Sequence, residues 1–371
     1  MIETRRGKLV ERLKEKGLDA VVIVPGANMS YFTGISLKQT ERLILTVITT
    51  NGDLFFIVPQ VEKSKFEMEG SGLVFWYTDE QGATKALTEF LSKSGTLEKV
   101  GIEYGRMTVK ELKAVESLDP ITIDDISDLV DSLRLYKDEQ EIDMCKKAVN
   151  IVEESLHNTL PFIKPGVKET EIAARLEYEM RKRGSQATPF ETIVASGYRG
   201  ALPHGRASEK QIQNGELVVL DFGAVFQGYV ADITRTVAVG EISNEFKEIY
   251  DIVKEAQQAA INAAKAGITS HEVDEAARKV IRHKGYGEFF THRTGHGIGL
   301  NGHEQPYIMQ TNQLVLKPGM TFTIEPGIYL PHKGGVRIED NIVINNHGVT
   351  NLMTYTKELI ILNGECSRVE S

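Results

Sequence analysis

The spacing of apolar positions divides the chain into two stretches of different texture. In the first stretch, short apolar runs alternate with segments of helical periodicity. The apolar runs predict strands at residues 18–24, 43–49, 54–58 and 99–103. Amphipathic spacing predicts helices near residues 9–17, 84–93 and 108–116. An Asn51-Gly52 pair between the second and third strands predicts a hairpin turn, and the stretch as a whole predicts a mixed α/β domain over residues 1–130.

The second stretch, residues 131–371, has longer elements that occur in runs of one type. Helical patterns cover residues 138–160, 169–183 and 245–265, and a further helix opens at a Thr269–Glu272 capping box and stops at Gly285. Strand patterns cover residues 190–195, 216–225 and 229–239. Strands and glycine-rich loops fill residues 292–362. Segregated runs of this kind predict an α+β domain with antiparallel pairing.

Two aspartates lie in the strongest predicted hairpin. Asp221 and Asp232 belong to the apolar strands 216–225 and 229–239. If the loop is Phe226-Gln227, the two residues face each other, with Cβ atoms about 4.5–5.5 Å apart. Buried like charges in that position are destabilising, and a divalent cation between them would resolve the conflict. The alternative is a pair of strand-end aspartates that are solvated or paired with Arg235.

Further candidate groups lie in the last third of the chain. Glu325 ends an apolar strand and is followed by a Pro-Gly turn. Arg337 and Glu339 share one face of the strand GGVRIEDNIVI, although a surface ion pair is an alternative for these two. Three of the nine histidines lie within THRTGHGIGLNGHEQP, where the glycines predict a loop that comes close to another part of the structure; they are His292, His296 and His303.

Composition narrows the chemistry that these residues could support. The 371 residues include two cysteines, Cys145 and Cys366, which excludes a disulfide framework or a multi-thiolate zinc site and favours a reducing cytoplasm. The net charge of −9 argues against a general nucleic-acid binder. No signal peptide is recognisable, and no apolar run approaches the ~20 residues that cross a bilayer. Any metal must therefore be held by Asp, Glu and His.

The ligand types favour particular metals. Carboxylates with one or more histidines suit oxygen-preferring divalent ions; manganese fits well, and cobalt and zinc are alternatives. Four carboxylates carry too much negative charge for one divalent ion. Two ions about 3.5–4 Å apart would balance them, as in two-metal hydrolases.

The order of these residues resembles a known family. Asp221, Asp232 eleven residues later, His296 in GHGIG, Glu325 in IEPG and Glu339 in VRIED together resemble the pita-bread metallopeptidases. That family includes methionine aminopeptidase, Xaa-Pro aminopeptidase and prolidase. The resemblance covers about residues 135–371. The segments LDAVVIV and NMSYFTG are also similar to the N-terminal domain of the proline-specific branch.

The resemblance implies a role for each site residue. The metal ligands would be the five residues just named, with Asp232 and Glu339 bridging two ions, and Glu325 would also transfer protons. His204 would lie near the substrate, His292 and His303 would flank the site, and Arg337 would support the bridging glutamate. Tyr307 stands where archaeal-type prolidases carry an arginine assigned to the substrate carboxylate, which leaves strict dipeptide selectivity open.

The resemblance also implies an activity. The leading hypothesis is an Xaa-Pro dipeptidase (prolidase), a cytoplasmic homodimer that uses two divalent metal ions, most simply Mn²⁺, to cleave proline-containing dipeptides or short peptides. The alternative is an Xaa-Pro aminopeptidase that acts on longer peptides. A lyase or a binding scaffold on the same fold would be the remaining hypotheses, because fold does not fix function. Neither a nucleic acid nor a membrane is expected as a partner.

Overall fold

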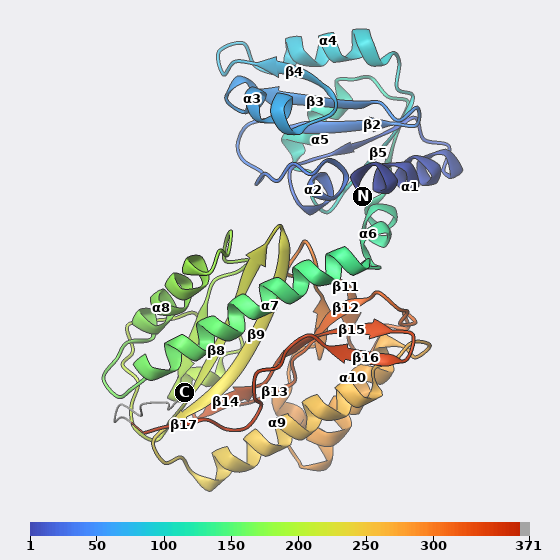
Figure 1. Ribbon diagram of the computed structural model, residues 1–371. Helices are drawn as coiled ribbons and strands as arrows, with labels where there is room; N and C mark the ends of the chain where they lie inside the picture. The colour runs from blue at the N-terminus through green and yellow to red at the C-terminus, as the bar shows by residue number, and fades with distance from the viewer. Residues whose placement is uncertain (364–371) are drawn as a thin grey trace. The chain divides into compact units, whose positions relative to one another are not determined.

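The computed structural model describes residues 1–363 and places them in two compact units. The first unit is Met1–Arg134, and the second begins at Leu135 (Figure 1). Cys366 lies outside the described residues. Each unit is described by itself below.

The first unit is built on a six-stranded mixed sheet with the strand order β4-β3-β2-β1-β5-β6. The strands are β1 (Ala20–Ile23), β2 (Leu45–Thr49), β3 (Leu54–Pro59), β4 (Leu73–Tyr77), β5 (Lys99–Ile102) and β6 (Thr122–Asp125). The helices are α1 (Ile2–Glu15), α2 (Ala27–Thr33), α3 (Gln60–Glu69), α4 (Thr84–Ser94), α5 (Val109–Glu116) and α6 (Ser127–Arg134). The expected hairpin is confirmed, because β2 and β3 pair antiparallel across residues 50–53.

Several elements of this unit were absent from the sequence prediction. Helix α2 is short and buried on almost all sides, so it lacks the alternating faces that reveal a helix. Strands β4 and β6 form the two edges of the sheet, and their residues are partly exposed. Strand β6 (TIDD) lacks a continuous apolar run, whereas β4 (LVFWY) is apolar throughout and could have been predicted from its sequence. Helices α3 and α6 were likewise not predicted.

The second unit contains two larger sheets and a two-stranded ribbon. Strand orders are β17-β9-β8-β7, β11-β10-β12-β15-β16 and β13-β14. The strands are β7 (Ile193–Ser196), β8 (Glu216–Phe226), β9 (Tyr229–Val239), β10 (Gly295–Gly297), β11 (Glu304–Ile308), β12 (Thr321–Ile324), β13 (Gly327–Leu330), β14 (Gly334–Arg337), β15 (Asp340–Asn345), β16 (Gly348–Asn351) and β17 (Ile361–Leu362). The longer helices are α7 (Glu139–Thr159), α8 (Glu169–Lys182), α9 (Asn244–Ala263) and α10 (Ser270–His283), joined by 3₁₀ turns at Leu160–Phe162, Gly197–Ala201 and Gly287–Phe289.

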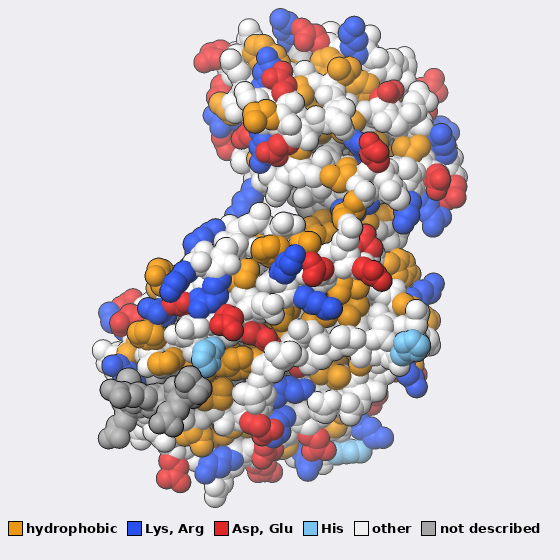
Figure 2. Space-filling view, in the orientation of Figure 1, with side chains coloured by type: hydrophobic (Ala, Val, Ile, Leu, Met, Phe, Trp, Pro, Cys, Tyr) orange, Lys and Arg blue, Asp and Glu red, His pale blue; other side chains and the backbone are white. Residues whose placement is uncertain are grey.

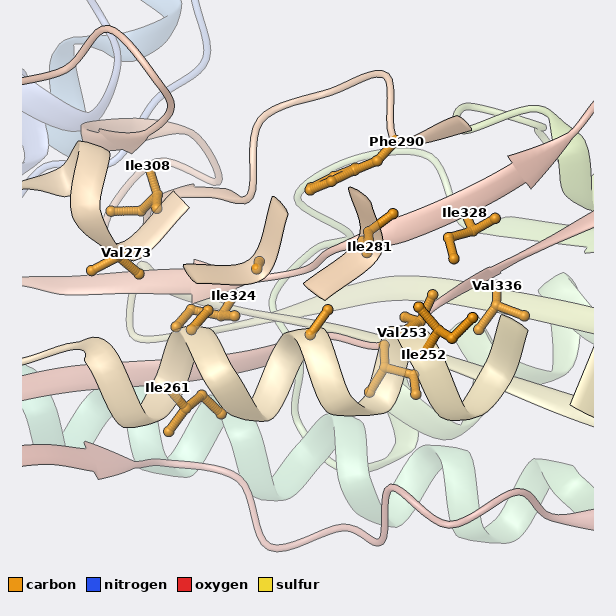
Figure 3. Close-up of a cluster of buried hydrophobic side chains, with 14 of the residues drawn as sticks. Ile252, Val253, Ile261, Val273, Ile281, Phe290, Ile308, Ile324, Ile328 and Val336 are labelled. Carbon is orange, nitrogen blue, oxygen red and sulfur yellow. The ribbon is translucent and has the colours of Figure 1, made fainter. Parts of the chain in front are cut away.

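Two pairs of helices enclose the strands of the second unit (Figure 1). Helices α7 and α8 pack on β7, β8 and β9 around one apolar cluster. Helices α9 and α10 pack against β11 to β14 around a second cluster. Figure 3 shows the second cluster, in which Val253 from α9 and Ile281 from α10 lie beside Ile328 and Val336 of the ribbon. The predicted α+β organisation is thereby confirmed.

The predicted register of the central hairpin is wrong by one residue in the turn. The loop is Gln227-Gly228 instead of Phe226-Gln227, and both loop residues have positive φ, as a two-residue hairpin turn requires. Asp221 consequently pairs with Thr234, and Asp232 pairs with Gly223. The two aspartates are diagonal neighbours and not directly opposite. They still share one face, because the shift moves the pairing by two residues and side chains alternate with a period of two.

Charge is interspersed over the surface. Figure 2 shows Lys and Arg side chains mixed with Asp and Glu side chains on the visible face of each unit. Within residues 1–363, no helix combines the length and the apolar character that a bilayer crossing needs.

Candidate metal centre and surrounding cavity

The strands of the second unit bring most of the sequence-predicted residues to one cavity of about 800 Å³. Its walls are formed by Phe190, Glu191, Ile193, Pro203, His204, Arg206, Asp221, Asp232, His292, Arg293, His296, His303, Glu325, Arg337 and Glu339. Tyr307 is the one candidate residue that does not line it directly. Tyr307 lies instead behind Arg293, whose guanidinium carbon is 4.6 Å from the centre of the tyrosine ring.

Three potential ligand residues meet at the floor of this cavity. Asp232, His296 and Glu339 are buried and each offers one donor atom, and the three atoms lie within 4.8 Å of one another. His296 Nε2 is 3.8 Å from an Asp232 oxygen and 3.3 Å from a Glu325 oxygen. Asp221 joins the group from β8, on the same face as Asp232 of β9. Four carboxylates and one imidazole therefore converge, and we refer to these five residues as the acidic cluster.

Backbone and side-chain hydrogen bonds hold the strands of the acidic cluster together. The Glu339 backbone N–H donates to the Thr234 carbonyl, and the Thr234 hydroxyl donates to Glu339 Oε2 at 2.7 Å. The Asp232 backbone N–H donates to the Asn341 side-chain oxygen. Val336 and Ile338 point into the apolar core, whereas Arg337 and Glu339 line the cavity. The predicted alternation of Arg337 and Glu339 with apolar residues is confirmed, although the predicted single strand is divided into β14 and β15 at residues 338–339. The surface ion pair is excluded by the burial of both residues.

The hydrogen bonds of His296 fix which of its nitrogens faces the carboxylates. Nδ1 lies 3.1 Å from the Gly297 carbonyl, which only accepts, so Nδ1 carries the proton. Burial and the neighbouring His303 hold the pKa of His296 well below its ordinary value, so the ring is neutral. Nε2 therefore presents a lone pair to Asp232 and Glu325. A lone pair facing carboxylate oxygens is unfavourable unless a cation lies between them.

The carboxylates of the acidic cluster lack the partners that buried anions need. Asp221 Oδ1, Asp232 Oδ1 and Glu339 Oε1 have no hydrogen-bond partner within residues 1–363. Burial, followed by the charges of the other carboxylates, raises the pKa values of Asp232 and Glu339 well above their ordinary values. Burial likewise raises the pKa of Glu325 to about 7. A divalent cation would bind the unpartnered carboxylate oxygens and the neutral imidazole, and it would offset the repulsion between the carboxylates. The residues present therefore fit a metal centre.

A directed chain of hydrogen bonds borders the acidic cluster. Arg337 donates to the Tyr329 hydroxyl at 2.8 Å, and that hydroxyl lies 2.7 Å from His292 Nε2. His292 Nδ1 faces the Arg293 carbonyl at 2.6 Å, so Nδ1 donates there and Nε2 accepts from Tyr329. Burial, with the Arg337 charge, lowers the pKa of His292 to about 3, which keeps the ring neutral. Tyr329 was not found from the sequence, because a tyrosine in an apolar strand reads as core.

Arg337 contacts a different carboxylate from the one that the resemblance implied. Its guanidinium is 2.5 Å from Asp221, and its Nε donates to the Thr234 hydroxyl at 3.1 Å. Because Thr234 in turn donates to Glu339, Arg337 reaches that glutamate through one intervening side chain. Arg235 does not pair with the acidic cluster either, since its partner is Asp340 at 2.8 Å.

The histidine loop is held by helix α10 and by close backbone packing. Asp274 accepts from the Thr294 backbone N–H and hydroxyl, and Arg278 donates to the His292 carbonyl. A Cβ atom at Gly295 would overlap the Thr323 carbonyl, and one at Gly297 would overlap the Gln305 carbonyl. The expectation of a close approach is confirmed, but the expected loop is interrupted by strand β10 (Gly295–Gly297), which pairs with β11 and β12.

The remaining predicted histidines lie at the rim. His204 and His303 are both exposed. The His303 ring packs edge-on against His296, with a centroid distance of 4.0 Å. Within the described part of the chain, neither nitrogen of His303 has a hydrogen-bond partner, so the ring is available to a ligand in the cavity. Although His303 is exposed, partial desolvation of its ring, followed by the Arg293 charge, lowers its pKa.

Comparisons with known proteins identify the class to which this site belongs. The model of metallopeptidase family M24 matches residues 143–346, and the Creatinase/Prolidase N-terminal domain matches residues 5–136. The chain therefore belongs to metallopeptidase family M24. Its second unit is the pita-bread domain of that family and its first is the Creatinase/Prolidase N-terminal domain, which confirms the resemblance seen in the sequence.

Individual relatives match over nearly the whole chain. An Xaa-Pro dipeptidase of Pyrococcus horikoshii is 40% identical over 357 residues, which cover 95% of this chain and 97% of that protein. The structure of an Xaa-Pro dipeptidase from Bacillus anthracis is 39% identical, with a TM-score of 0.89 over 98% of this chain and all of that one. The structure of an X-Pro aminopeptidase from Thermotoga maritima is 37% identical, with a TM-score of 0.88 over 96% of this chain and 99% of that one.

Proposed function

We propose that the chain is an Xaa-Pro dipeptidase, which hydrolyses the bond between an N-terminal residue and a following proline. The observation that carries the proposal is the convergence of four carboxylates and the Nε2 lone pair of His296 on one cavity in a member of family M24. The near-full-length similarity to an Xaa-Pro dipeptidase supports this substrate class.

The acidic cluster is the proposed metal centre. Asp221, Asp232, His296, Glu325 and Glu339 would hold two divalent ions. When bound, the ions would supply Lewis acidity and lower the pKa of a water molecule toward neutrality. The oxygen-rich donor set favours Mn²⁺, with Co²⁺ and Zn²⁺ as alternatives.

Glu325 is the proposed general base and acid. Burial raises its pKa to about 7, which is the range in which a carboxyl group both takes and returns a proton at neutral pH. It would accept a proton from the attacking water and deliver it to the proline nitrogen as the peptide bond breaks. Its backbone N–H donates to the Thr294 carbonyl at 2.8 Å, which fixes the start of the side chain relative to the histidine loop.

The histidines would have separate tasks. His292 uses both ring nitrogens within the protein, so it would position Tyr329 and Arg337 instead of donating to substrate. His303 has free nitrogens facing the cavity and would donate to the carbonyl oxygen as it gains negative charge. His204, which also lines the cavity, would contact the substrate.

An Xaa-Pro aminopeptidase is the second candidate. Tyr307, which holds no charge, stands at the position where the resemblance implied a carboxylate-binding arginine, and one solved relative is an X-Pro aminopeptidase. A cytoplasmic homodimer completes the proposal; the scarcity of cysteine supports the compartment, and the family resemblance alone supports the dimer.

The test is a cleavage assay on the metal-free protein to which Mn²⁺, Co²⁺ or Zn²⁺ is added back. Ala-Pro and Ala-Pro-Ala would be compared, with Ala-Ala as a control that lacks proline. The dipeptidase predicts metal-dependent cleavage of Ala-Pro and a lower kcat/KM for Ala-Pro-Ala. The reverse order would favour the aminopeptidase, and bound metal without cleavage of either peptide would favour another activity on this fold.

A further inference from the structure

His204 reaches the cavity on a loop and not on a helix or a strand. The loop consists of residues 197–207, between the end of β7 and Ser208, and His204 lines the cavity beside Pro203. Within residues 1–363, the His204 ring has no hydrogen-bond partner, and its side chain is exposed. Because no hydrogen bond of its own fixes the ring, the position of His204 depends on how the loop is held.

The two ends of this loop meet at one buried carboxylate. Glu169, the first residue of helix α8, is 0% exposed. One of its oxygens accepts from the Ser196 backbone N–H and hydroxyl, at 2.7 and 2.8 Å. The other oxygen accepts from the Ser208 backbone N–H and hydroxyl, at 3.1 and 2.7 Å, and from the Arg199 guanidinium. Each oxygen of Glu169 therefore binds one end of the loop.

The hydrogen bonds of Glu169 serve the loop and not its own helix. Within the described residues, all five donors to the carboxylate belong to the loop or to its two ends. A carboxylate offers about four lone-pair positions, so both oxygens are fully used. Lys210 donates to the Ser196 hydroxyl at 2.9 Å, which leaves that hydroxyl to donate to Glu169. Hydrogen bonds to an ionised group are stronger than those between neutral groups, so this attachment is firm.

Further contacts hold the backbone on both sides of His204. Arg337 of the cavity wall donates to the Pro203 carbonyl at 3.2 Å. Arg199, which binds the buried carboxylate, also donates to the Arg206 carbonyl at 2.8 Å. His204 thus lies between two backbone carbonyls that arginines hold in place. One of these arginines is itself fixed by the carboxylate that joins the loop ends.

We propose that Glu169 is a positioning residue of the active site, whose carboxylate closes the loop 197–207 and so holds His204 against the substrate. The inference rests on the proposed function, in which His204 contacts the substrate. Glu169 is not among the residues that line the cavity, so it acts through the loop. Misplacement of a contacting group by about 1 Å can lower a rate by about a hundredfold. Release of the loop should therefore weaken turnover without removing any group that touches the substrate.

The experiment is a double-mutant cycle on the metal-loaded enzyme with Ala-Pro as the substrate. Glu169→Gln replaces one acceptor oxygen with an NH₂ group, which cannot accept from the donors at its end of the loop. Its kcat/KM should fall by about ten- to a hundredfold, divided between kcat and KM as in His204→Ala. Adding Glu169→Gln to His204→Ala should lower kcat/KM little further, because both changes remove the same contact with the substrate.

Hydrogen–deuterium exchange measures the loop independently of activity. The backbone N–H groups of Ser196 and Ser208 both donate to Glu169. Peptides that span residues 196–208 should therefore exchange faster in Glu169→Gln than in the wild type. Peptides from β12 and β15 should exchange at the wild-type rate, because the change leaves the strands beside the acidic cluster intact.

Glu179→Gln is the matched control. Glu179 is a buried glutamate of the same helix, is 1% exposed, and pairs with Arg175 and Arg183 instead of the loop. Its substitution should lower stability but leave kcat/KM and the exchange of residues 196–208 unchanged. Ser208→Ala removes one donor to Glu169 and should give a smaller loss in the same direction. If Glu169→Gln does not fold, Ser208→Ala takes its place in the cycle.

The outcomes are distinguishable. Failure of the wild type to cleave Ala-Pro with metal present would overturn the proposed function and this inference with it. If the wild type cleaves Ala-Pro, the inference alone is overturned by unchanged kinetics or unchanged exchange in Glu169→Gln, by wild-type kinetics in His204→Ala, by losses that add in the double variant, or by an equal loss of kcat/KM in Glu179→Gln. A non-additive loss together with faster exchange of the loop supports both.

Discussion

Glu339 and Asp340 are neighbours in the chain, and each is 1% exposed, yet their surroundings are opposite in character. Glu339 faces the acidic cluster, where one of its oxygens has no partner within residues 1–363 and its pKa is raised by burial and by other carboxylates. Asp340 faces the other side, where Arg235 is at 2.8 Å and Gln257, Asn351 and Lys357 surround the second oxygen.

Asp340 shows how this fold treats a buried carboxylate that has only a structural role. Although burial alone raises the pKa of Asp340, the charges of Arg235 and Lys357 hold it below its ordinary value. A compensated anion at the first residue of β15 and an uncompensated one just before that strand are therefore adjacent in the chain. The difference teaches that the missing partners of the acidic cluster are a property of that site and not of buried carboxylates in this protein.

The largest effect is expected at Glu325. Glu325→Gln keeps the shape but removes the group that takes and returns a proton, so kcat on Ala-Pro should fall by about 10²–10⁴-fold. Steady-state kinetics with saturating Mn²⁺ would measure this, with circular dichroism to show that the variant is folded. Activity close to that of the wild type would remove Glu325 from the catalytic role.

Opposite effects on stability are expected at Asp340 and Glu339. Asp340→Ala leaves the Arg235 guanidinium buried without its carboxylate and should lower the free energy of unfolding by about 3–5 kcal/mol. Glu339→Gln removes a repelled charge and should raise the stability of the metal-free protein while abolishing turnover. Urea denaturation in the presence of a chelator gives both values. If both substitutions destabilise the metal-free protein, the contrast drawn between Glu339 and Asp340 is wrong.

The pH dependence of the metal-free protein should carry the signature of Glu325. Its pKa is about 7 in the folded protein and 4.5 ordinarily, so the folded state keeps a proton that the unfolded state releases between these values. This contribution to stability is complete below pH 4.5 and is lost as pH rises toward about 7. Asp340 acts in the opposite sense, because its lowered pKa favours folding above the ordinary value and loses that contribution as pH falls.

Denaturation at a series of pH values from 4.5 to 7.5, with chelator, would measure this dependence as the difference between the wild type and Glu325→Gln. The wild type should lose stability relative to the variant as pH rises. Added Mn²⁺ should raise the melting temperature more at pH 7 than at pH 5, since protons compete with the ion for the same oxygens. A difference that is constant across this range would contradict the assigned pKa.

The smallest effect is expected at Thr234, whose hydroxyl bonds to both Glu339 and Arg337. Its hydroxyl donates to Glu339 at 2.7 Å and accepts from Arg337 at 3.1 Å. Thr234→Val keeps the shape and removes both hydrogen bonds, so stability should fall by about 0.5–1.5 kcal/mol. Thr236→Val is the control, because its hydroxyl donates to the Arg337 carbonyl and does not contact a carboxylate of the acidic cluster. A change in metal affinity confined to Thr234→Val would link this hydroxyl to the centre.

Local patterns predicted the elements of the site well. Strand 229–239 has the bounds that the sequence indicated, and the alternation of Arg337 and Glu339 with apolar residues was right. The register of the hairpin was wrong, because two adjacent two-residue loops are compatible with the same apolar runs and only backbone conformation selects Gln227-Gly228. The prediction that Asp221 and Asp232 share one face was still right, because the two registers differ by two residues and side chains alternate with a period of two.

Contacts between distant segments could not be predicted in the same way. Arg337 reaches Asp221, which lies 116 positions earlier in the chain, and periodicity carries no information about such pairs. Tyr329 was missed for a related reason. It belongs to a segment whose local pattern is explained by packing, and its contacts with His292 and Arg337 form only when the cavity is assembled.

The close packing at Gly295 has a mechanical consequence for the acidic cluster. A methyl group there would press on the Thr323 carbonyl, two residues before Glu325, in the strand that pairs with β15, whose first residue, Asp340, directly follows Glu339. The backbone shift would therefore displace Glu325 and Glu339 without changing the chemistry of either carboxylate. Gly295→Ala would change the spacing of the metal ligands. We therefore expect this substitution to lower the metal affinity more than it lowers the stability of the protein.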